Sequence, residues 1–491
     1  MYDNVQTFSF SNIDKFSTAS IVTRLTTDVT NIQNAYQMLI RMAVRGPVML
    51  VFSMIVSFRI NTTIALIFLA VIPIMAVLLL LIIRKVGPLF GRVFRTYDTL
   101  NNVVQENVRG IRVVKSFNQE DHEIKKFKGI SQSIYEDFAA GERLLAFNSP
   151  IMQFFMYACM ILISWIGAKA IVASGNSAAL GMTTGDLTAL FSYATQILMA
   201  LMMLSMVFTM ITISLASARR IAEVLEEKTD IDNPADPIMA VRDGSIRFEH
   251  VDFAYAAKAD KKVLSDIDLS IVSGQTVGII GGTGSSKSSL VQLIPRLYDV
   301  SSGRLLLGGV DVRKYDLDVL RNAVAMVLQK NELFSGTIKE NLRWGNENAT
   351  DEEIEEACRL ACADEFIQSF PDKYDTYIEQ GGANVSGGQK QRLCIARALL
   401  KKPKVLILDD STSAVDTKTD ASIQKSFAEF IPDTTKIIIA QRVSSVQHAD
   451  LIVVMDEGKI VATGRHEELL KTCDIYREVY ESQQEGDSEH E

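Results

Sequence analysis

Hydrophobic residues are spread unevenly along this chain, and their pattern divides it into two parts. The first part, up to about residue 216, is dominated by long apolar stretches separated by polar segments with a helical period. Four stretches are long enough to cross a bilayer as helices, at about residues 42–58, 64–83, 151–173 and 187–215. The first is the weakest candidate, because it contains Arg45, Gly46 and Pro47. A globular core is the alternative, and the length of the stretches argues against it.

The second part has the shorter apolar runs of a soluble domain. An acidic, Pro-bearing segment follows residue 225, and after it strands and helices alternate, as expected for an α/β domain. We therefore predict a multidomain fold, in which an all-α transmembrane bundle precedes an α/β domain. The predicted boundaries are 1–225 for the membrane domain, 226–241 for the linker, 242–484 for the α/β domain and 485–491 for an acidic tail.

Basic residues predict how the chain lies across the membrane. Lys and Arg recur from Arg84 to Arg143, between the second and third stretches, whereas residues 174–186 contain neither. The positive-inside rule places the basic segment in the cytoplasm, together with both chain ends. Residues 84–148 keep a helical period, and residues 17–58 read as one long helix, so we expect helices that project beyond the bilayer. These projections would push against the α/β domain. The alternative is that they are stalks surrounded by water.

Composition excludes some classes of function. The 491-residue chain has a formal net charge of −9 and no basic block with interleaved aromatic residues, which argues against a nucleic-acid partner. Its five cysteines form no CxxC pair, so we expect neither a disulfide framework nor a cysteine metal site.

A phosphate-binding loop is the strongest chemical signal in the second part. The apolar strand 276–280 is followed by a run of small residues and then by a lysine at the start of an apolar helix. Small residues let successive backbone N–H groups turn toward an anion, the lysine reaches the outer phosphates, and the next hydroxyl can bind Mg²⁺. The predicted loop comprises Gly281, Gly282, Thr283, Gly284, Ser285, Ser286, Lys287, Ser288 and Ser289. For the loop alone, a Gly/Ser-rich surface turn is the alternative.

Two further patterns suit metal and phosphate chemistry. The buried strand 405–408 ends in Asp409 and Asp410. The first carboxylate is placed to hold Mg²⁺, and the second stands where a water-activating base would be. A second helix start could meet another phosphate through its N–H groups and its dipole. That helix start consists of Ser386, Gly387, Gly388 and Gln389.

Three single residues complete the set. Gln329 follows the apolar strand 323–328, Tyr255 precedes a change from strand to loop, and Asp416 follows the two aspartates. Each residue alone is weak evidence. Together with the loop, and in this order and spacing, they are highly specific.

At this point the chain resembles a known family. Residues 1–484 are similar to one half of an ABC exporter, of the type that fuses a type-1 transmembrane domain to an ATP-binding domain. The resemblance implies that ATP and Mg²⁺ are bound, with Tyr255 on the adenine and the loop on the phosphates. Ser288, Gln329 and Asp409 would hold the metal, and Gln329 would link it to the membrane domain. Asp416 would cross the dimer interface.

The resemblance also implies a dimer and a means of coupling. Residues 386–389 would be the signature that closes over the ATP of a partner subunit. Phe10–Leu25 and Glu106–Phe117 resemble the regions that carry the two cytoplasmic coupling helices. The long helical projections would then carry motion between the two domains.

Three positions depart from the family pattern. Asp410 replaces the catalytic glutamate, Gln441 replaces the switch histidine, and Ser286 replaces a loop glycine. Asp is one methylene shorter than Glu, and losing general-base help costs about 10²–10⁴ in rate. Gln441 cannot become cationic, so it stabilises developing γ-phosphate charge less well. We therefore expect a site that binds ATP but hydrolyses it slowly.

An impaired site and an intact signature predict an asymmetric pair. This chain would join a different half-transporter, and residues 386–389 would complete that partner's competent site. The alternatives are a homodimer with two slow sites, a non-transporting scaffold or regulatory subunit that does not hydrolyse ATP, and a non-functional gene fragment. The fragment alternative arises because such a half has six spans and four are found here.

The expected cargo is hydrophobic, either drug-like or lipid-like. The fourth stretch is rich in methionine, which suits an adaptable binding surface, although helical spacing of methionines also fits plain packing. We expect a multi-pass protein of the cell membrane with its ATP-binding domain in the cytoplasm.

Overall fold

The computed structural model describes residues 1–16, 18–177, 181–255, 262–410 and 415–488. The chain forms two compact units. Unit 1 comprises Met1–Asn4 and Thr18–Glu226, and unit 2 comprises Val5–Ser17 and Glu227–Glu491. The hydrophobic pattern did not indicate that Val5–Ser17 packs with the second unit.

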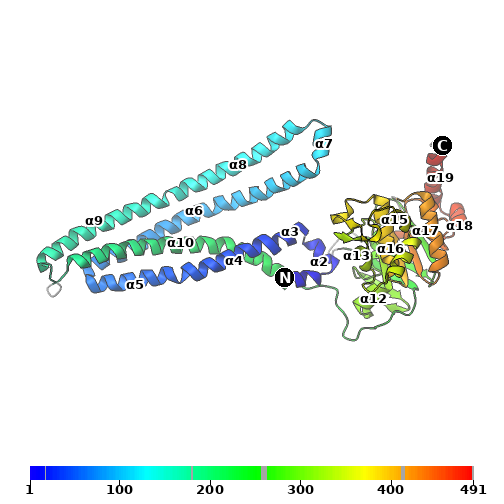
Figure 1. The fold of residues 1–491 in the computed structure, drawn as a ribbon, viewed down its shortest axis with the longest axis horizontal. Helices are drawn as coiled ribbons and strands as arrows, with labels where there is room; N and C mark the ends of the chain where they lie inside the picture. Colours follow the sequence, from blue (N-terminus) through cyan, green and yellow to red (C-terminus); the bar gives the residue numbers. More distant parts are fainter. Residues whose placement is uncertain (17, 178–180, 256–261, 411–414, 489–491) are drawn as a thin grey trace. The chain divides into compact units, whose positions relative to one another are not determined.

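The secondary-structure elements of unit 1, among its described residues, are all helices (Figure 1). A continuous helix from Thr18 to Ile60 contains two short π-helical turns, and the remaining helices are long. The elements are α3 (Thr18–Thr23), η1 (Arg24–Asp28), α4 (Val29–Met38), η2 (Leu39–Ala43), α5 (Arg45–Ile60), α6 (Thr62–Arg109), α7 (Ile111–Ser116), α8 (Glu120–Ala146), α9 (Asn148–Ser174) and α10 (Thr184–Glu226). Helix α6 packs along α8, and helix α5 packs along α10 (Figure 1).

Unit 1 turns many apolar side chains outward. Phe52 is 62% exposed, Ile161 69% and Val172 83%. By length and composition four helical segments could cross a membrane among the described residues, namely Ser20–Ile60, Thr62–Val93, Glu120–Ser174 and Thr184–Phe208. Each predicted span lies largely within one of these segments. An outward apolar surface suits lipid, because lipid tails do not penalise exposed apolar side chains as water does.

Polar side chains join the first long helix of unit 1 to α10. The side chain of Asp28 is fully buried and accepts a bidentate pair of hydrogen bonds from the Arg220 guanidinium, with Nε 2.7 Å from Oδ2. Arg24 donates from Nη1 to the Arg220 carbonyl at 2.7 Å and forms an ion pair with Glu223 at 3.0 Å. Asp28 ends the π-helical turn η1, and such turns interrupt the helical ladder at functionally important places.

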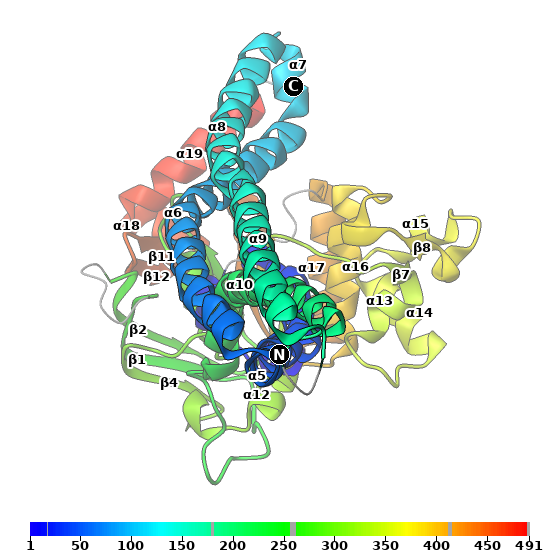
Figure 2. The same cartoon turned by 90° about the vertical axis from the view of Figure 1, so that its left-hand side faces the viewer.

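Unit 2 is an α/β domain whose main sheet has six strands in the order β12-β11-β3-β10-β9-β6. A second sheet has the order β2-β1-β4-β5 and lies away from helices α13–α16 (Figure 2). The strands are β1 (Ile246–Phe253), β2 (Leu264–Ile271), β3 (Thr276–Ile280), β4 (Ser302–Leu307), β5 (Val310–Asp311), β6 (Val324–Val327), β7 (Gly336–Thr337), β8 (Tyr377–Ile378), β9 (Val405–Asp409), β10 (Thr435–Ile439), β11 (Leu451–Asp456) and β12 (Lys459–Gly464). The helices are α11 (Lys287–Gln292), α12 (Leu317–Ala323), α13 (Ile338–Arg343), α14 (Asp351–Leu360), α15 (Asp364–Gln368), α16 (Gly387–Leu400), α17 (Thr417–Phe430), α18 (His466–Thr472) and α19 (Asp474–Ser488).

The six-stranded sheet is buried on both faces. Alternate residues of one strand belong to different hydrophobic clusters: Leu406 and Leu408 pack in one, and Val405 and Ile407 in the other. All five residues of β9 are buried. A strand with both faces covered reads as a continuous apolar run, which is why the sequence of β9 shows no alternation.

The short helix α2 (Phe10–Lys15) is the part of residues 5–17 that anchors them to unit 2. Ser9 caps it and donates a hydrogen bond to Asp230, and Asn12 donates to Glu227 at 2.9 Å. The Tyr298 hydroxyl donates to the Asp14 carboxylate at 2.8 Å. These contacts join segments more than 200 residues apart in the sequence.

The ion pair in unit 1 gives a test of stability. Replacing Arg220 with alanine leaves the fully buried Asp28 carboxylate without its bidentate partner. We expect the thermal midpoint of the purified chain in detergent to fall by roughly 5–10 °C, since breaking a buried pair costs several kcal/mol. The matched control is Arg219→Ala, at an exposed neighbouring position on the same helix. Equal shifts for the two variants would contradict the assignment.

The phosphate loop gives a second test. Ser286 has φ of 67°, in the left-handed region, where a Cβ is strained and glycine is not. Ser286→Gly should therefore stabilise unit 2 by about 1 kcal/mol, measured as a rise in its thermal midpoint. Ser286→Ala keeps the Cβ and serves as the control, for which we expect no gain. A rise with alanine as large as that with glycine would argue against backbone strain.

Candidate nucleotide-binding site

The predicted phosphate loop surrounds a cavity at the carboxyl edge of the main sheet. The cavity has a volume of about 240 Å³. Its lining joins the loop after β3 to the ends of β9 and β10 and to the segment after β6. The lining residues are Gly281, Thr283, Gly284, Ser285, Ser286, Lys287, Ser288, Ser289, Gln329, Asp409, Asp410, Ile439 and Gln441. Gly282, the remaining predicted loop residue, is exposed beside it and accepts a hydrogen bond from Lys287.

Lys287 is folded back over the loop. Its Nζ donates to the carbonyl oxygens of Gly281 at 2.8 Å and Gly282 at 2.9 Å, and to Ser285 Oγ at 3.2 Å. Partial burial lowers the pKa of this amine, while the charges of Asp409 and Asp410 act in the opposite direction. An anion in the cavity would interact favourably with the positive charge of the Lys287 amine.

Two oxygen atoms make a candidate metal position. Ser288 Oγ donates to Asp409 Oδ1 at 3.0 Å, and the Asp409 side chain is buried. Burial raises the pKa of Asp409, and the charge of Asp410 raises it further, whereas the Ser288 hydrogen bond lowers it. A hydroxyl and a carboxylate are the hard oxygen ligands that Mg²⁺ prefers, and a cation here would relieve the raised pKa. The donor set therefore fits Mg²⁺.

Asp410 is held by two neutral amides. Its Oδ2 accepts from Gln441 Nε2 at 2.8 Å and from Gln329 Nε2 at 3.1 Å. Asp410 also has positive φ, at 49°, a conformation that Asp tolerates better than most residues. The structure thus brings together Asp410 and Gln441, which were predicted for the chemical step, and Gln329, which was predicted for the metal.

Tyr255 lies near the loop but is not among the residues that line the cavity. Its hydroxyl is 2.9 Å from Ser289 Oγ, and its ring packs edge-on against Tyr298 and Phe253 at 5.0 and 4.9 Å. Tyr255 is 46% exposed. Tyr298 was missed from the sequence, because its place beside Tyr255 depends on tertiary packing.

The signature residues and Asp416 do not line this cavity in the described part of the chain. Ser386 caps α16 and forms a capping box with Gln389, with Gln389 N 3.3 Å from Ser386 Oγ. Gly387 and Gly388 form the first turn of that helix. Asp416 caps α17 by accepting from the Thr419 amide at 2.9 Å, and hydrogen bonds from the Thr419 side chain and then its amide lower the pKa of Asp416. The neighbouring Ser413 lies outside the described residues.

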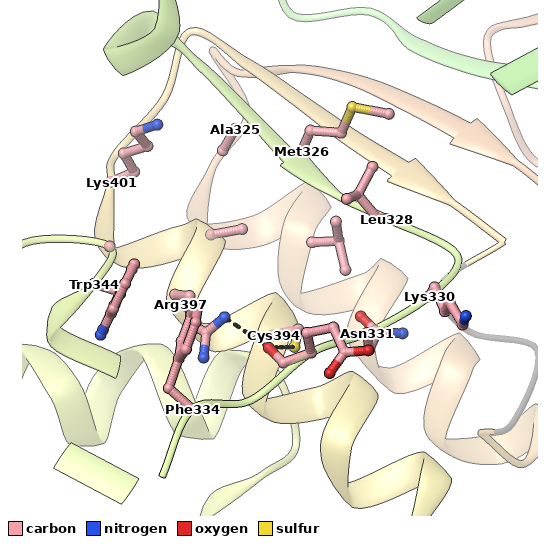
Figure 3. Close-up of a pocket in the computed structure, with 14 residues that line it drawn as sticks. Ala325, Met326, Leu328, Lys330, Asn331, Phe334, Trp344, Cys394, Arg397 and Lys401 are labelled. Atoms are coloured by element: carbon pink, nitrogen blue, oxygen red, sulfur yellow. Dashed lines mark hydrogen bonds between the residues drawn. The ribbon is translucent and has the colours of Figure 1, made fainter. Parts of the chain in front are cut away.

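A second cavity, of about 280 Å³, is lined in part by Leu328 and Lys330, which flank Gln329 in the sequence (Figure 3). Met326 and Leu328 lie on one wall, opposite the stacked rings of Phe334 and Trp344, whose centroids are 4.1 Å apart. Trp344 is 65% exposed. One segment therefore supplies Gln329 to the phosphate cavity and its neighbours on both sides to this second cavity.

Comparisons with known proteins agree with this geometry. The ABC transporter transmembrane region matches residues 1–202, and the ABC transporter family matches residues 264–413. The chain is 38% identical over 483 residues to the ABC transporter ATP-binding protein YfiB of Bacillus subtilis, covering 98% of this chain and 82% of that protein. It is 33% identical over 492 residues to an ATP-dependent lipid A-core flippase of Desulfotalea psychrophila, covering 98% and 83%.

A solved structure shows the same architecture. A bacterial Atm1-family ABC exporter with ATP bound superposes with a TM-score of 0.86 at 25% identity, over 98% of this chain and 84% of that chain. The fold is therefore a helical transmembrane bundle followed by an α/β ATPase domain, as the sequence predicted. ATP hydrolysis coupled to transport is the general activity of such exporters. The chain belongs to the ABC transporter family, as a half-transporter in which a transmembrane region is fused to an ATP-binding domain.

Proposed function

We propose that this chain is one subunit of an ATP-driven exporter whose own nucleotide site binds Mg·ATP but hydrolyses it slowly. The observation that carries the proposal is the hydrogen bonding of Asp410, whose Oδ2 is shared by the neutral amides of Gln441 and Gln329. In a hydrolysing site this position needs a carboxylate that accepts a proton from water. Here the shorter side chain is directed toward two amide donors within the protein.

Gln441 would slow hydrolysis further. An amide donates a hydrogen bond but carries no positive charge, so it offers less to the charge that develops on the γ-phosphate. Two hydrogen bonds to one carboxylate oxygen also occupy lone pairs that an attacking water would need as its acceptor. Both substitutions act on the chemical step and leave the phosphate-binding groups in place.

Binding of Mg·ATP is supported by the remaining groups. The loop amides would hold the phosphates, Lys287 would reach the outer phosphates, and Ser288 with Asp409 would hold Mg²⁺. When bound, Mg²⁺ would neutralise charge on the β- and γ-phosphate oxygens. Tyr255, which is partly exposed, would stack on the adenine.

The position of the signature supports a two-chain site. Ser386 and Gln389 stand at an exposed helix start that does not line the cavity of their own chain among the described residues. Facing subunits of a two-fold dimer exchange such surfaces, so residues 386–389 would close over the partner's ATP. In this proposal the chain's own site is impaired, whereas its signature is intact. The signature therefore contributes most to hydrolysis if the partner is a second, different half-transporter that has a competent site. A homodimer would contain two slow sites.

Coupling to the membrane domain would pass through Gln329. This residue lies between the phosphate cavity and the second cavity, so a shift at the metal would also move Met326 and Leu328. The helices α2 and α7 correspond to the predicted coupling regions. In α7 and directly after it, Val113 is 60% and Phe117 70% exposed, which leaves apolar surface for a domain of the partner chain.

The proposed cargo is a lipid-like or other hydrophobic molecule. Met199, Met202 and Met206 are 52%, 47% and 57% exposed along α10 and provide an adaptable apolar surface. A flippase named for lipid A-core is among the relatives. We place the exporter in the cell membrane, with the ATP-binding domain in the cytoplasm, as the basic segment between Arg84 and Arg143 indicates.

Comparing substitutions at Ser386 and Lys287 tests the proposed asymmetry between the two nucleotide sites. In the complex isolated from its native host through a tag on this chain, Ser386→Ala should lower Mg-ATPase activity by about 10²-fold, because it removes a donor from the partner's competent site. Lys287→Ala should leave most of the activity, because this chain's own site contributes little. Thr350→Ala removes a similar capping box at α14 and controls for lost helix stability. Activity that survives both site substitutions would favour a scaffold subunit.

A double substitution tests the impaired site itself. Asp410→Glu together with Gln441→His should raise hydrolysis in membranes that contain this chain alone by about 10²–10⁴-fold, with each single change giving less. Adding Asp409→Asn should abolish the gain, because the metal position is lost. If the unmodified chain alone already hydrolyses ATP rapidly, the proposal of a slow site is wrong.

A further inference from the structure

The C-terminal helix α19 contacts the loop that carries Gln441. Gln483 Oε1 accepts a hydrogen bond from the Val443 amide at 2.9 Å, and Gln483 Nε2 donates to the Gln441 carbonyl at 2.8 Å. One carboxamide therefore closes a ring of two hydrogen bonds on the loop. Both partner groups belong to the main chain, so the contact does not depend on which side chain occupies position 441.

The helix that supplies Gln483 is anchored independently of this loop. Tyr476 is fully buried in the hydrophobic core, and its hydroxyl is 2.8 Å from His466 Nδ1. Tyr480 packs edge-on against the same imidazole ring, with the ring centroids 5.2 Å apart. Residues at positions i, i+4 and i+7 share one face of a helix, so the two tyrosines place Gln483 toward the core side.

The loop is held on its other side by the main sheet. The Ala440 amide donates to the Ile279 carbonyl at 3.2 Å, and the Asp410 amide donates to the Ile439 carbonyl at 3.0 Å. Val443 is 1% exposed. Gln441 itself is exposed, so its main chain is fixed between the end of the sheet and the carboxamide of Gln483.

We propose that Gln483 is a positioning residue of the nucleotide site. Its carboxamide fixes the main chain at Gln441 and Val443 and so determines where the Gln441 side chain meets Asp410. The effect on nucleotide chemistry rests on the proposed function, whereas the clamp on the loop rests on the hydrogen bonds alone. The C-terminal helix thereby becomes part of the nucleotide site, although Gln483 does not line the phosphate cavity.

Hydrogen–deuterium exchange of the full-length chain in detergent tests the clamp directly. Gln483→Ala should raise the exchange rate of peptides that cover residues 440–446 by about tenfold, as expected when one or two hydrogen bonds are lost. Gln483→Glu keeps an acceptor for the Val443 amide but loses the donor to Gln441, so its exchange rate should be intermediate. The matched control is Gln484→Ala, whose side chain instead donates to the Tyr480 hydroxyl at 2.9 Å. Unchanged exchange in Gln483→Ala, or an equal rise in Gln484→Ala, would overturn the inference.

Kinetics test whether the clamp affects chemistry. In the Asp410→Glu, Gln441→His background, adding Gln483→Ala should lower kcat by about tenfold with KM for ATP little changed, because a misplaced group costs turnover and the phosphate loop is untouched. A background that fails to hydrolyse ATP contradicts the proposed function, while the exchange result still decides the clamp. Faster exchange with unchanged kcat would show that Gln483 holds the loop without serving the reaction, and would also overturn the inference.

Discussion

The register of three parallel strands determines where most groups of the phosphate cavity lie. In β10, Ile439 pairs with Ile279 of β3 on one side and with Asp409 of β9 on the other. The three strands therefore end level with one another, and the loops that leave them share one edge of the sheet. The phosphate loop and the two adjacent carboxylates lie at that edge. The switch position, two residues beyond Ile439, lies there too. Moving one strand by a single residue would turn its side chains to the other face and dismantle the site.

The same sheet explains the electrostatics of the cavity. Because both of its faces are covered by apolar clusters, Asp409 is buried at its edge and Lys287 is partly buried there. Burial raises the pKa of Asp409 and lowers that of Lys287, so each is pushed toward its neutral form. Mg²⁺ beside the carboxylate and phosphate beside the lysine would each reverse that effect. The charges of the proposed site would therefore be best satisfied with Mg²⁺ and a nucleotide both bound.

Local patterns in the sequence were sufficient to predict the long apolar helices and the loop between β3 and α11. Their signals, a long apolar run or a strand followed by small residues and lysine, are contained in short windows. The association of Val5–Ser17 with unit 2 was not predictable in this way, because Ser9 and Asp14 contact Asp230 and Tyr298 across more than 200 residues. The Gln483 clamp was missed for the same reason: a glutamine in a polar helix carries no signal until packing brings it to the loop. The roles assigned to the site residues remain predictions.

Retaining ATP binding without rapid hydrolysis has a consequence for the proposed asymmetric dimer. Each nucleotide would join the loop of one subunit to the signature of the other, so two nucleotides stabilise one shared interface. When the competent site hydrolyses its ATP, the slow site would keep a nucleotide and continue to hold the two domains together. The domains would then open at one site while the other acts as a hinge. In the proposed dimer, Asp410 and Gln441 would serve such a hinge, because they would slow the chemical step and leave in place the groups that would bind ATP.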